Sequence, residues 1–531
     1  MKNCNPRNLP QPQLHHSMNL PRLPFLAHTL HHPGVGLKCM TITLHITRAL
    51  IFAAVCFGAL LPGLLAAEAT GPLRVHPANP RYFANAAGKA VYLTGSHTWP
   101  NLQDMGVTNP PPIFDFDTHL DFLAQHGHNF IRLWRYELIK WTRWSEKDAP
   151  VRYIGQHPWR RTGPGVAFDG LPKFDFTQWD ESHFERLRAR VRAAGKRGIY
   201  VSIMFFEGWC LRIKPSSWDG HMMHAANNIN GIDGDPDGDG FGLEVQMLRI
   251  PAITELQRAY IRKVIDTVND LDNVLYEISN ESLYHPDILK WQIEMIRYAN
   301  EYQAGKPRQH PVGMTNLVAM TQKDKAATNE VLFASAAQWV SPGAIPFGAA
   351  DVYSVNPPVT TGDKVVILDS DHTWNNACMT RTSKLRADHA WVWKSFLRGY
   401  NPIYMDPLDH EEPDGVLAYA KANAYAVVLA RPAMGHTRTY SERIDLAAMT
   451  PRNDLASTEY CLANPGREYL VYLPDGGEAA VDFTAARGVL TVEWFNPRTA
   501  EKSEGERVKG GAKRTFRAPF TGDAVLYLKA E

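Results

Sequence analysis

The segment Val274-Leu-Tyr-Glu-Ile-Ser-Asn-Glu-Ser282 decides the fold of this 531-residue chain. Its first part is a largely apolar run rich in β-formers, which predicts a buried strand. Asn280 and Glu281 follow directly, and a core does not accommodate two such side chains without partners. Considered alone, the start of a loop explains them as well as a catalytic site does, so the rest of the chain must decide.

Helical patterns flank this strand on both sides. Apolar residues recur at helical spacing over residues 253–269 before it, and from Pro286 to Tyr298 after it. A helix, a buried strand, a polar turn and a second helix make one unit of a parallel α/β fold. In such folds the chemistry takes place at the carboxyl ends of the strands.

Eight strands of this kind are predicted, with helical patterns between most of them. They predict an α/β protein with a (β/α)8 TIM barrel over residues 70–440, whose loops are enlarged because the fold typically takes about 250 residues. An open doubly wound sheet is the alternative, but no Gly-rich phosphate loop follows the first strand. The predicted strands are 91–98, 129–136, 198–206, 274–279, 312–316, 350–356, 365–371 and 402–406, and the predicted helices include 116–125, 179–196, 388–398 and a closing helix at 417–434.

Both ends of the chain differ from the barrel. Residues 1–39 carry no periodic apolar pattern and are interpreted as disordered or as a misassigned start, and residues 40–69 as a signal peptide, with an uncleaved anchor as the alternative. Export would make the protein secreted or periplasmic. Alternating segments at 469–473, 489–495 and 524–528 predict a small antiparallel β-sandwich domain at 441–531, which either binds a polymer or braces the barrel.

The composition limits the partners. A formal net charge of +1 argues against nucleic acid or a membrane surface as the main partner, and no stable membrane insertion is expected after signal cleavage. The 14 Trp and 20 Tyr residues supply flat apolar faces that serve sugar sites, although cores use them too. Beyond residue 69, Cys210, Cys378 and Cys461 are too few and too widely spaced for a disulfide framework, although one bridge is possible.

Polar or aromatic residues close each predicted strand, and a barrel would gather them at one mouth. Cleavage of a glycosidic bond needs a proton donor and an opposing carboxylate. Glu281 is predicted as the acid/base. Asp369 and Asp371 both qualify as its partner because strand alternation puts them on one face, and Asp369 is preferred as the nucleophile. The predicted substrate-side residues are His97, Trp99, Arg132, Trp134, Trp209, Asn280, Tyr353, His372 and Trp374, and Glu207 and Asp406 also lie at strand ends.

Several motifs resemble known families. Asn280-Glu281 closing strand four, an acid closing strand seven and Arg132 on strand two resemble the clan A glycoside hydrolases. The resemblance implies a glycosidase, with retention favoured, although most clan A enzymes place Glu at strand seven. Ala78-Asn-Pro-Arg-Tyr-Phe83, Asn227-Asn-Ile-Asn-Gly-Ile-Asp233, Asp369-Ser-Asp-His372 and Asn401-Pro-Ile-Tyr-Met-Asp-Pro407 look like the apiosidase-like barrels, and residues 514–528 resemble the collagen-binding domain described for a collagenase.

One acidic segment has the spacing of an EF-hand calcium loop, with Gly238 at position six. It departs from that pattern at position eight, which is Gly240, so a solvated acidic turn is the alternative. No cofactor is required for the predicted reaction, and a structural Ca²⁺ is possible. The candidate ligands are Asp233, Asp235, Asp237, Asp239 and Glu244.

The sequence thus favours an exported glycoside hydrolase that acts on an oligo- or polysaccharide of plant or microbial origin. A non-catalytic carbohydrate- or matrix-binding protein on a barrel scaffold is the first alternative. A collagen-directed protease is the second, but the sequence contains no metal-binding helix and no serine-triad signature.

Overall fold

The computed structural model describes residues 68–142, 150–213, 217–319, 322–343, 352–373, 388–406 and 424–531. The predicted disordered start, nearly all of the predicted signal peptide, Trp374, Cys378 and the first part of the predicted closing helix lie outside these ranges. Cys210 and Cys461 are buried and free. In the described part of the chain, no helix is both long and apolar enough to cross a bilayer.

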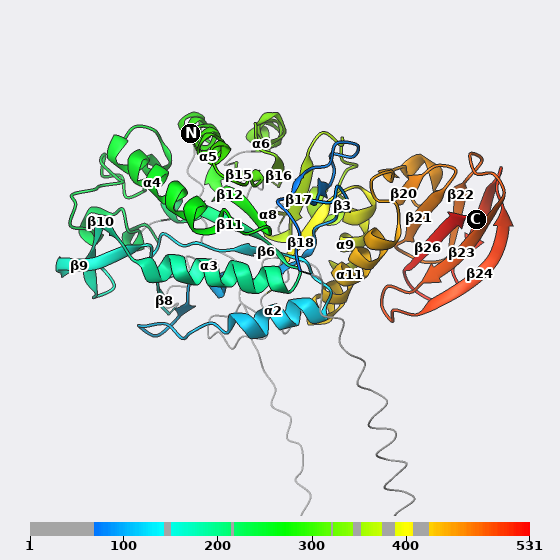
Figure 1. Ribbon diagram of the computed structural model, residues 1–531, viewed down its shortest axis with the longest axis horizontal. Coiled ribbons are helices and arrows are strands. Elements are labelled where there is room, and N and C mark those ends of the chain that lie inside the picture. The colour runs from blue at the N-terminus through cyan, green and yellow to red at the C-terminus, as the bar shows by residue number, and fades with distance from the viewer. Residues whose placement is uncertain are drawn as a thin grey trace, which may run out of the picture. The chain divides into compact units, whose positions relative to one another are not determined.

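Eight parallel strands form a nearly closed barrel, which confirms the predicted fold (Figure 1). At the remaining seam, the Asn129 N–H donates to the Thr94 carbonyl, and the Asn129 Oδ1 accepts the Thr94 N–H, both at 2.9 Å. Gly95 permits this close approach, because a Cβ there would lie 2.2 Å from the Phe130 carbonyl oxygen. In chain order the strands are β4 (Gly95–His97), β6 (Phe130–Leu133), β11 (Tyr200–Glu207), β12 (Val274–Asn280), β14 (Val312–Thr315), β16 (Trp339–Ser341), β17 (Val365–Asp369) and β18 (Asn401–Met405).

The predicted sixth strand at 350–356 is wrong. That position in the barrel belongs to β16, and Val352–Val355 is the helical turn α7. Val352 and Val355 are 56% and 60% exposed, so the apolar residues behind this prediction do not enter the core. The seventh strand also ends two residues earlier than predicted, at Asp369, where the turn α8 (Ser370–Thr373) begins.

Helices surround the strands (Figure 1). The helical pattern predicted at 253–269 is confirmed by α4 (Pro251–Val268), since Ile253, Tyr260 and Val264 are buried. The helix α3 (Glu181–Lys196) begins after Asp180, whose side chain accepts the Ser182 N–H. The helices are α2 (Phe116–Gln125), α3 (Glu181–Lys196), α4 (Pro251–Val268), α5 (Pro286–Ala304), α6 (Gln322–Ala334), α9 (Asp388–Leu397) and α11 (Ala424–Arg443).

Long loops follow the first barrel strands, as the enlarged spacing predicts. The loop after β6 carries β7 (Lys140–Trp141), β8 (Arg152–Ile154) and the antiparallel ribbon of β9 (Trp159–Val166) and β10 (Pro172–Trp179). The loop after β11 is built from short 3-10 turns. These turns are η2 (Trp209–Arg212), η3 (Trp218–Gly220), η4 (Ala225–Asn227) and η5 (Leu243–Gln246). The short elements in other parts of the chain are η1 (Trp99–Asn101), β1 (Arg74–Val75), β2 (Phe83–Ala84), β3 (Ala90–Val91), β5 (Met105–Gly106), β13 (Ser282–Leu283) and β15 (Leu317–Val318).

The C-terminal residues form the predicted antiparallel β-domain. A six-stranded sheet in the order β19-β20-β21-β26-β23-β24 packs with the two-stranded sheet β22-β25 around a core that includes Val481, Leu490 and Phe516. Two barrel helices contact this domain: the Trp393 ring stacks 6.0 Å from Tyr472, and the Tyr440 hydroxyl donates to Glu493 Oε1 at 2.8 Å. The strands are β19 (Thr450–Pro451), β20 (Cys461–Asn464), β21 (Glu468–Leu473), β22 (Glu478–Asp482), β23 (Val489–Phe495), β24 (Lys502–Lys509), β25 (Lys513–Arg517) and β26 (Ala524–Ala530), and η6 (Asn453–Leu455) lies between the first two.

Candidate active site

Arg132 of β6 joins three strands of the barrel. Its Nη1 donates to Asp369 Oδ2 at 2.5 Å, its Nε and Nη2 donate to Glu277 at 2.9 and 2.6 Å, and Nη2 also donates to Asn280 Oδ1 at 2.9 Å. Burial alone would lower the pKa of Arg132, but the charges of Glu277 and Asp369 outweigh it and raise that pKa. The guanidinium therefore stays charged and fixes the carboxyl ends of β6, β12 and β17 relative to one another.

A histidine and a backbone amide also hold Asp369. His97 Nε2 lies 3.2 Å from Asp369 Oδ1, and the Asp371 N–H donates to the same oxygen at 2.9 Å. The Trp134 indole N–H donates to His97 Nδ1 at 2.7 Å. Because Nδ1 accepts, we assign the proton of the neutral ring to Nε2, which donates to Asp369. Together with Arg132, these donors fix the position of the Asp369 carboxyl.

Asp371 lies in the electrostatic field of both other acids. Burial raises its pKa well above the ordinary value of 3.8, and the charges of Glu281 and Asp369 raise it further, while Arg132 opposes them. The acid that follows β12 and the acids at the end of β17 are therefore gathered at one mouth of the barrel. The pairing of Glu281 with one of these aspartates stays a prediction.

Glu281 has a strained backbone and a cationic partner. Its φ is +46°, a left-handed conformation that costs a non-glycine residue energy and marks positions held by their surroundings. Its side chain is 21% exposed, and Arg212 Nη2 donates to Glu281 Oε2 at 2.5 Å. The Gly208 N–H donates to the Asn280 carbonyl at 2.8 Å, which ties the loop after β11 to this turn.

Two further residues of the site have no predicted role. Arg212 is the last residue of η2, and Glu207 is the fully buried last residue of β11. Burial raises the pKa of Glu207 well above 4.5, and the charge of Glu281 adds to this effect. Glu207 is the last residue of a buried strand, as Asn280 is. A polar residue at the end of a buried strand is the sequence feature that could have identified Glu207 as part of the site. The contact of Arg212 depends on the path of a loop, which has no periodic signal.

Aromatic rings adjoin this mouth. The Trp141 ring is buried and lies edge-on to Trp99 at 6.1 Å and to Trp209 at 5.3 Å. Trp99 and Trp209 are partly exposed and suit the predicted stacking on sugar rings. Trp134 is 2% exposed and stacks on His97 with the ring centroids 5.6 Å apart, so it orients that histidine.

The other predicted substrate residues come from strands six and seven. Tyr353 belongs to α7 instead of a barrel strand; its carbonyl accepts the Trp391 indole N–H at 2.8 Å, and its ring lies 6.2 Å from that of Tyr400. His372 belongs to α8, and its side chain is outside the described part of the structure.

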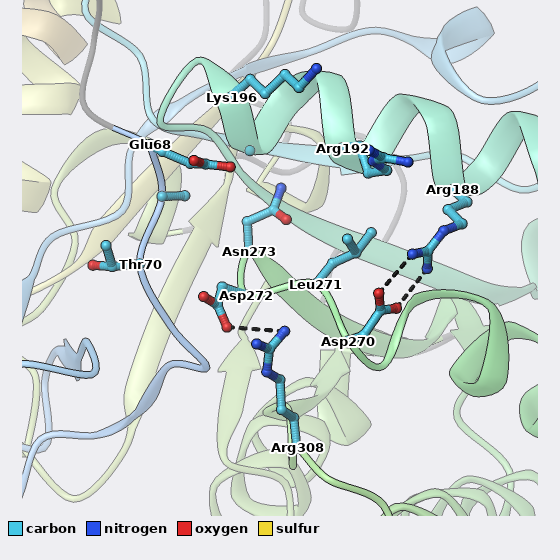
Figure 2. Close-up of a pocket in the computed structure, with 12 residues that line it drawn as sticks. Glu68, Thr70, Arg188, Arg192, Lys196, Asp270, Leu271, Asp272, Asn273 and Arg308 are labelled. Carbon is cyan, nitrogen blue, oxygen red and sulfur yellow. Dashed lines mark hydrogen bonds and ion pairs between the residues drawn. The ribbon is translucent and has the colours of Figure 1, made fainter.

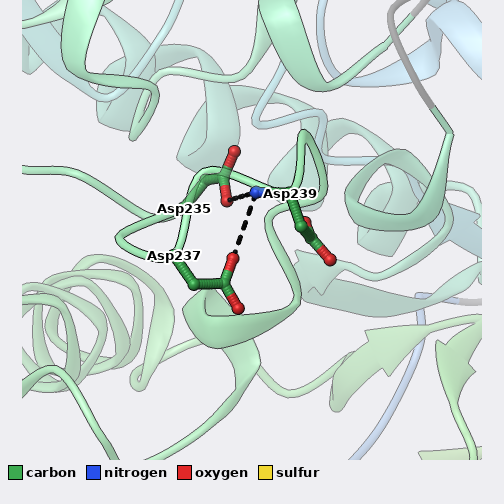
Figure 3. Close-up of side chains that lie close together, drawn as sticks. All are labelled: Asp235, Asp237 and Asp239. Carbon is green, nitrogen blue, oxygen red and sulfur yellow. Dashed lines mark hydrogen bonds between the residues drawn. The ribbon is translucent and has the colours of Figure 1, made fainter.

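The acidic loop brings three of the five predicted calcium ligands together. Carboxylate oxygens of Asp235, Asp237 and Asp239 lie within 4.8 Å of one another (Figure 3). Asp233 instead accepts the Asp235 N–H at 3.1 Å. Burial raises the pKa of Glu244, and the charges of the three clustered aspartates raise it further, so Glu244 lies near them. All of these groups offer oxygen, the ligand atom that Ca²⁺ prefers.

A cavity of about 490 Å³ lies elsewhere in the structure, and Figure 2 shows the residues that line it. Its walls come from the end of α3 and from the segment before β12, which is the amino-terminal face of the barrel. Two ion pairs line it, Arg188 with Asp270 at 2.6 Å and Arg308 with Asp272 at 3.3 Å. In TIM barrels this face serves stability, whereas the carboxyl face carries catalysis.

Comparisons with known proteins agree with this architecture. Residues 142–324 match a family described as "Domain of unknown function (DUF6298)", and residues 448–529 match "Putative collagen-binding domain of a collagenase". The second match confirms the resemblance predicted for the C-terminal domain. No curated protein matches the chain.

Solved structures match most of the chain. A structure named "Glycoside hydrolase" is 13% identical, with a TM-score of 0.56, and the alignment covers 87% of this chain and 97% of that one. A family 5 glycoside hydrolase from Bacteroides vulgatus is 12% identical, with a TM-score of 0.55 and coverage of 86% and 94%. The fold is that of these hydrolases. At such low identity the likeness establishes the architecture only, and the apiosidase-like resemblance stays a prediction.

Proposed function

We propose that this protein is an exported glycoside hydrolase that cleaves O-glycosidic bonds in plant or microbial polysaccharide. One observation carries the proposal: Glu281 follows β12 and Asp369 ends β17, so acids far apart in the chain lie at the same carboxyl mouth of the barrel, and the charge of Glu281 acts on Asp371. Two carboxyl groups across one site are the minimal equipment for this reaction. The names of the similar structures support the same class.

In the proposed mechanism Asp369 is the nucleophile. Arg132 and His97 hold its carboxylate, which would attack the anomeric carbon while the bond to the leaving oxygen breaks. Glu281 gives a proton to that oxygen. In the second step Glu281 takes a proton from water, whose oxygen attacks the anomeric carbon and releases Asp369, with net retention of configuration.

Two neighbours would support Glu281. Arg212 donates to Glu281 Oε2 and would hold that carboxyl in place through both steps. Burial and the charges of Glu281 and Asp369 raise the pKa of Asp371, which favours its uncharged form and would limit the negative charge around Glu281.

The sugar would lie between Asn280 and the partly exposed rings of Trp99 and Trp209. Asn280 is suited to a sugar hydroxyl, and the indoles to the apolar face of a ring. The predicted signal peptide supports export to the periplasm or the medium. The motifs shared with apiosidase-like barrels make pectic oligosaccharides the first substrates to test.

The test is hydrolysis of a panel of pectic and microbial oligosaccharides by the wild type, Glu281→Gln and Asp369→Asn. Each variant should lose at least about 10³-fold in kcat and still bind the sugar, because the shape of the site is kept. Glu181→Gln, an exposed acid of α3, is the matched control and should keep full activity. Sugar binding without turnover by the wild type would instead favour the non-catalytic alternative, and release of peptides from collagen would favour the protease.

A further inference from the structure

Glu207 lies at the inner end of the site, behind the groups that face the substrate. It is the last residue of β11, and its side chain is fully buried. Its Oε1 accepts two hydrogen bonds of 3.2 Å, from Nδ2 of Asn280 and from the backbone N–H of Trp209. Because no part of Glu207 is exposed, it does not touch the substrate, and its side-chain hydrogen bonds act on the reaction through these two neighbours.

The first neighbour belongs to a chain of contacts that ends at the nucleophile. Asn280 Oδ1 accepts Nη2 of Arg132 at 2.9 Å, and Nη1 of the same guanidinium donates to Asp369. The Asn280 amide is therefore held at its oxygen by Arg132 and at its nitrogen by Glu207. This pair of contacts fixes both the position of the amide and which of its two atoms faces each partner.

The second neighbour begins the turn that reaches Glu281. Trp209 is the first residue of η2 and Arg212 is the last, and Arg212 donates to Glu281. Between Glu207 and Trp209, Gly208 donates its N–H to the Asn280 carbonyl. The bond from Glu207 to the Trp209 N–H closes this bend, so one carboxyl group ties the loop after β11 to the end of β12.

We propose that Glu207 is a positioning residue that locks Asn280 and the start of η2 in the arrangement that meets the sugar. The inference deepens the proposed hydrolase function and depends on it. A displacement of about 1 Å in a positioned group can cost about 10²-fold in rate, which sets the size of the expected effect.

A neutral acceptor is sufficient for this role. Both contacts to Glu207 come from amide N–H groups, and a carbonyl oxygen accepts such hydrogens as well as a carboxylate oxygen does. Burial and the charge of Glu281 both raise the pKa of Glu207, which favours its uncharged form. Glu207→Gln should therefore preserve the arrangement, whereas Glu207→Leu removes the acceptor and keeps a similar volume.

The experiment is a double-mutant cycle on kcat/KM with a hydrolysed oligosaccharide. Glu207→Gln should stay within about threefold of the wild type, and Glu207→Leu should lose about 10²-fold. Adding Glu207→Leu to Asn280→Ala should cost clearly less than the about 10²-fold that it costs in the wild type, because one of the two groups that Glu207 positions is already gone. Losses that multiply in the double variant, or a Gln variant as impaired as the Leu variant, would overturn the proposal.

Two controls separate this inference from general instability and from the hydrolase proposal. Glu468→Gln alters another buried carboxyl that accepts a backbone N–H, in the C-terminal domain, and should leave kcat/KM unchanged at equal folded fraction. A crystal structure of Glu207→Leu should show the Asn280 amide turned away from Arg132, whether or not a substrate is known. An unmoved Asn280 would refute the inference alone, and absence of hydrolysis by the wild type would refute the hydrolase proposal alone.

Discussion

Nη1 of Arg132 lies 2.5 Å from Oδ2 of Asp369, and the other side of the same guanidinium makes two hydrogen bonds with Glu277. All three side chains are at most 2% exposed. Removing charges from water is costly, and only close pairing with further hydrogen bonds offsets the cost. The network therefore fixes the Asp369 carboxyl at the end of β17, where the proposed mechanism places the nucleophile.

Arg132→Met should destabilise the protein, because it leaves Glu277 and Asp369 as uncompensated buried charges. The expected loss in the free energy of unfolding is about 3–5 kcal/mol at neutral pH, measured by urea denaturation. The double variant Arg132→Met with Glu277→Met should recover part of that loss, since one stranded charge is gone. A loss below about 1 kcal/mol in the single variant would contradict the buried ionic network.

Asp371→Asn should stabilise the protein more at pH 8 than at pH 4. Burial and the charges of Glu281 and Asp369 raise the pKa of Asp371, so the folded state binds its proton more tightly than the unfolded chain does. Wild-type stability then falls as the pH rises from about 4 through the folded-state pKa, and the asparagine variant lacks this loss. The measurement is the difference in Tm between variant and wild type across that range.

Asp482→Asn is the control of opposite sign. The backbone N–H of Thr484 has the largest effect on the Asp482 carboxyl and lowers its pKa below the ordinary value. Its stabilising effect is therefore present above about pH 4 and lost only as the pH falls further. The Tm difference of this variant should stay flat between pH 4 and 8. A flat difference for Asp371→Asn as well would show that Asp371 does not titrate in this field.

The long strands and the amphipathic helices could be predicted from the sequence, because their signals are local. β12 and α4 each repeat one pattern over many residues, and the structure confirms both. β16 has only three residues, which are too few to show the alternation of apolar and polar residues that identifies a strand. The apolar residues at 350–356 look more like a strand, and the prediction therefore placed the sixth strand there. The barrel fold was predictable despite that error, because the remaining seven strands fixed the architecture.

Some residues of the candidate site could also be predicted from local patterns, and others could not. Arg132, Asn280 and Asp369 lie at the ends of regular strands, so their meeting follows from topology alone. The contacts of Arg212 and Glu207 depend on how the chain bends after β11 and packs against the end of β12, and a bend of this kind has no spacing to recognise. Asp371 was predicted beside Asp369 by strand alternation, but a helical turn brings it there.

Calcium should stabilise the acidic loop at Asp235, Asp237 and Asp239. A ligand at about 100 times its Kd adds about 2.7 kcal/mol to the free energy of unfolding, which a rise in Tm on calcium titration would report. Asp235→Asn with Asp237→Asn should abolish that rise, and Glu478→Gln, an exposed acid outside the loop, should keep it. An unchanged Tm of the wild type in calcium would favour the solvated acidic turn.

Trp99→Ala and Trp209→Ala should each raise KM for an oligosaccharide, because a partly exposed indole loses its contact with the sugar. An aromatic contact of about 1 kcal/mol corresponds to roughly a fivefold change. Trp159→Ala is the control, since that ring stacks on Trp179 at 3.7 Å within the β9–β10 ribbon and should change stability without changing KM. Unchanged KM in both site variants would contradict their role as sugar platforms.

Gly208→Ala should impair catalysis far more than it impairs folding. The backbone of Gly208 has φ −98°, which any residue adopts, so the effect must come from the added methyl group. A Cβ there would lie 2.6 Å from Cα and 2.7 Å from N of Ser282, and backbone atoms cannot move aside without shifting Glu281. The expected result is a loss of about 10²-fold in kcat, with the Tm within a few degrees of the wild type.

Gly305→Ala is the matched control, because a Cβ at that position would have no neighbouring atom within 4 Å and its φ of −88° is also allowed, so it should be neutral. Full activity in Gly208→Ala would show that the bend after β11 does not set the position of Glu281.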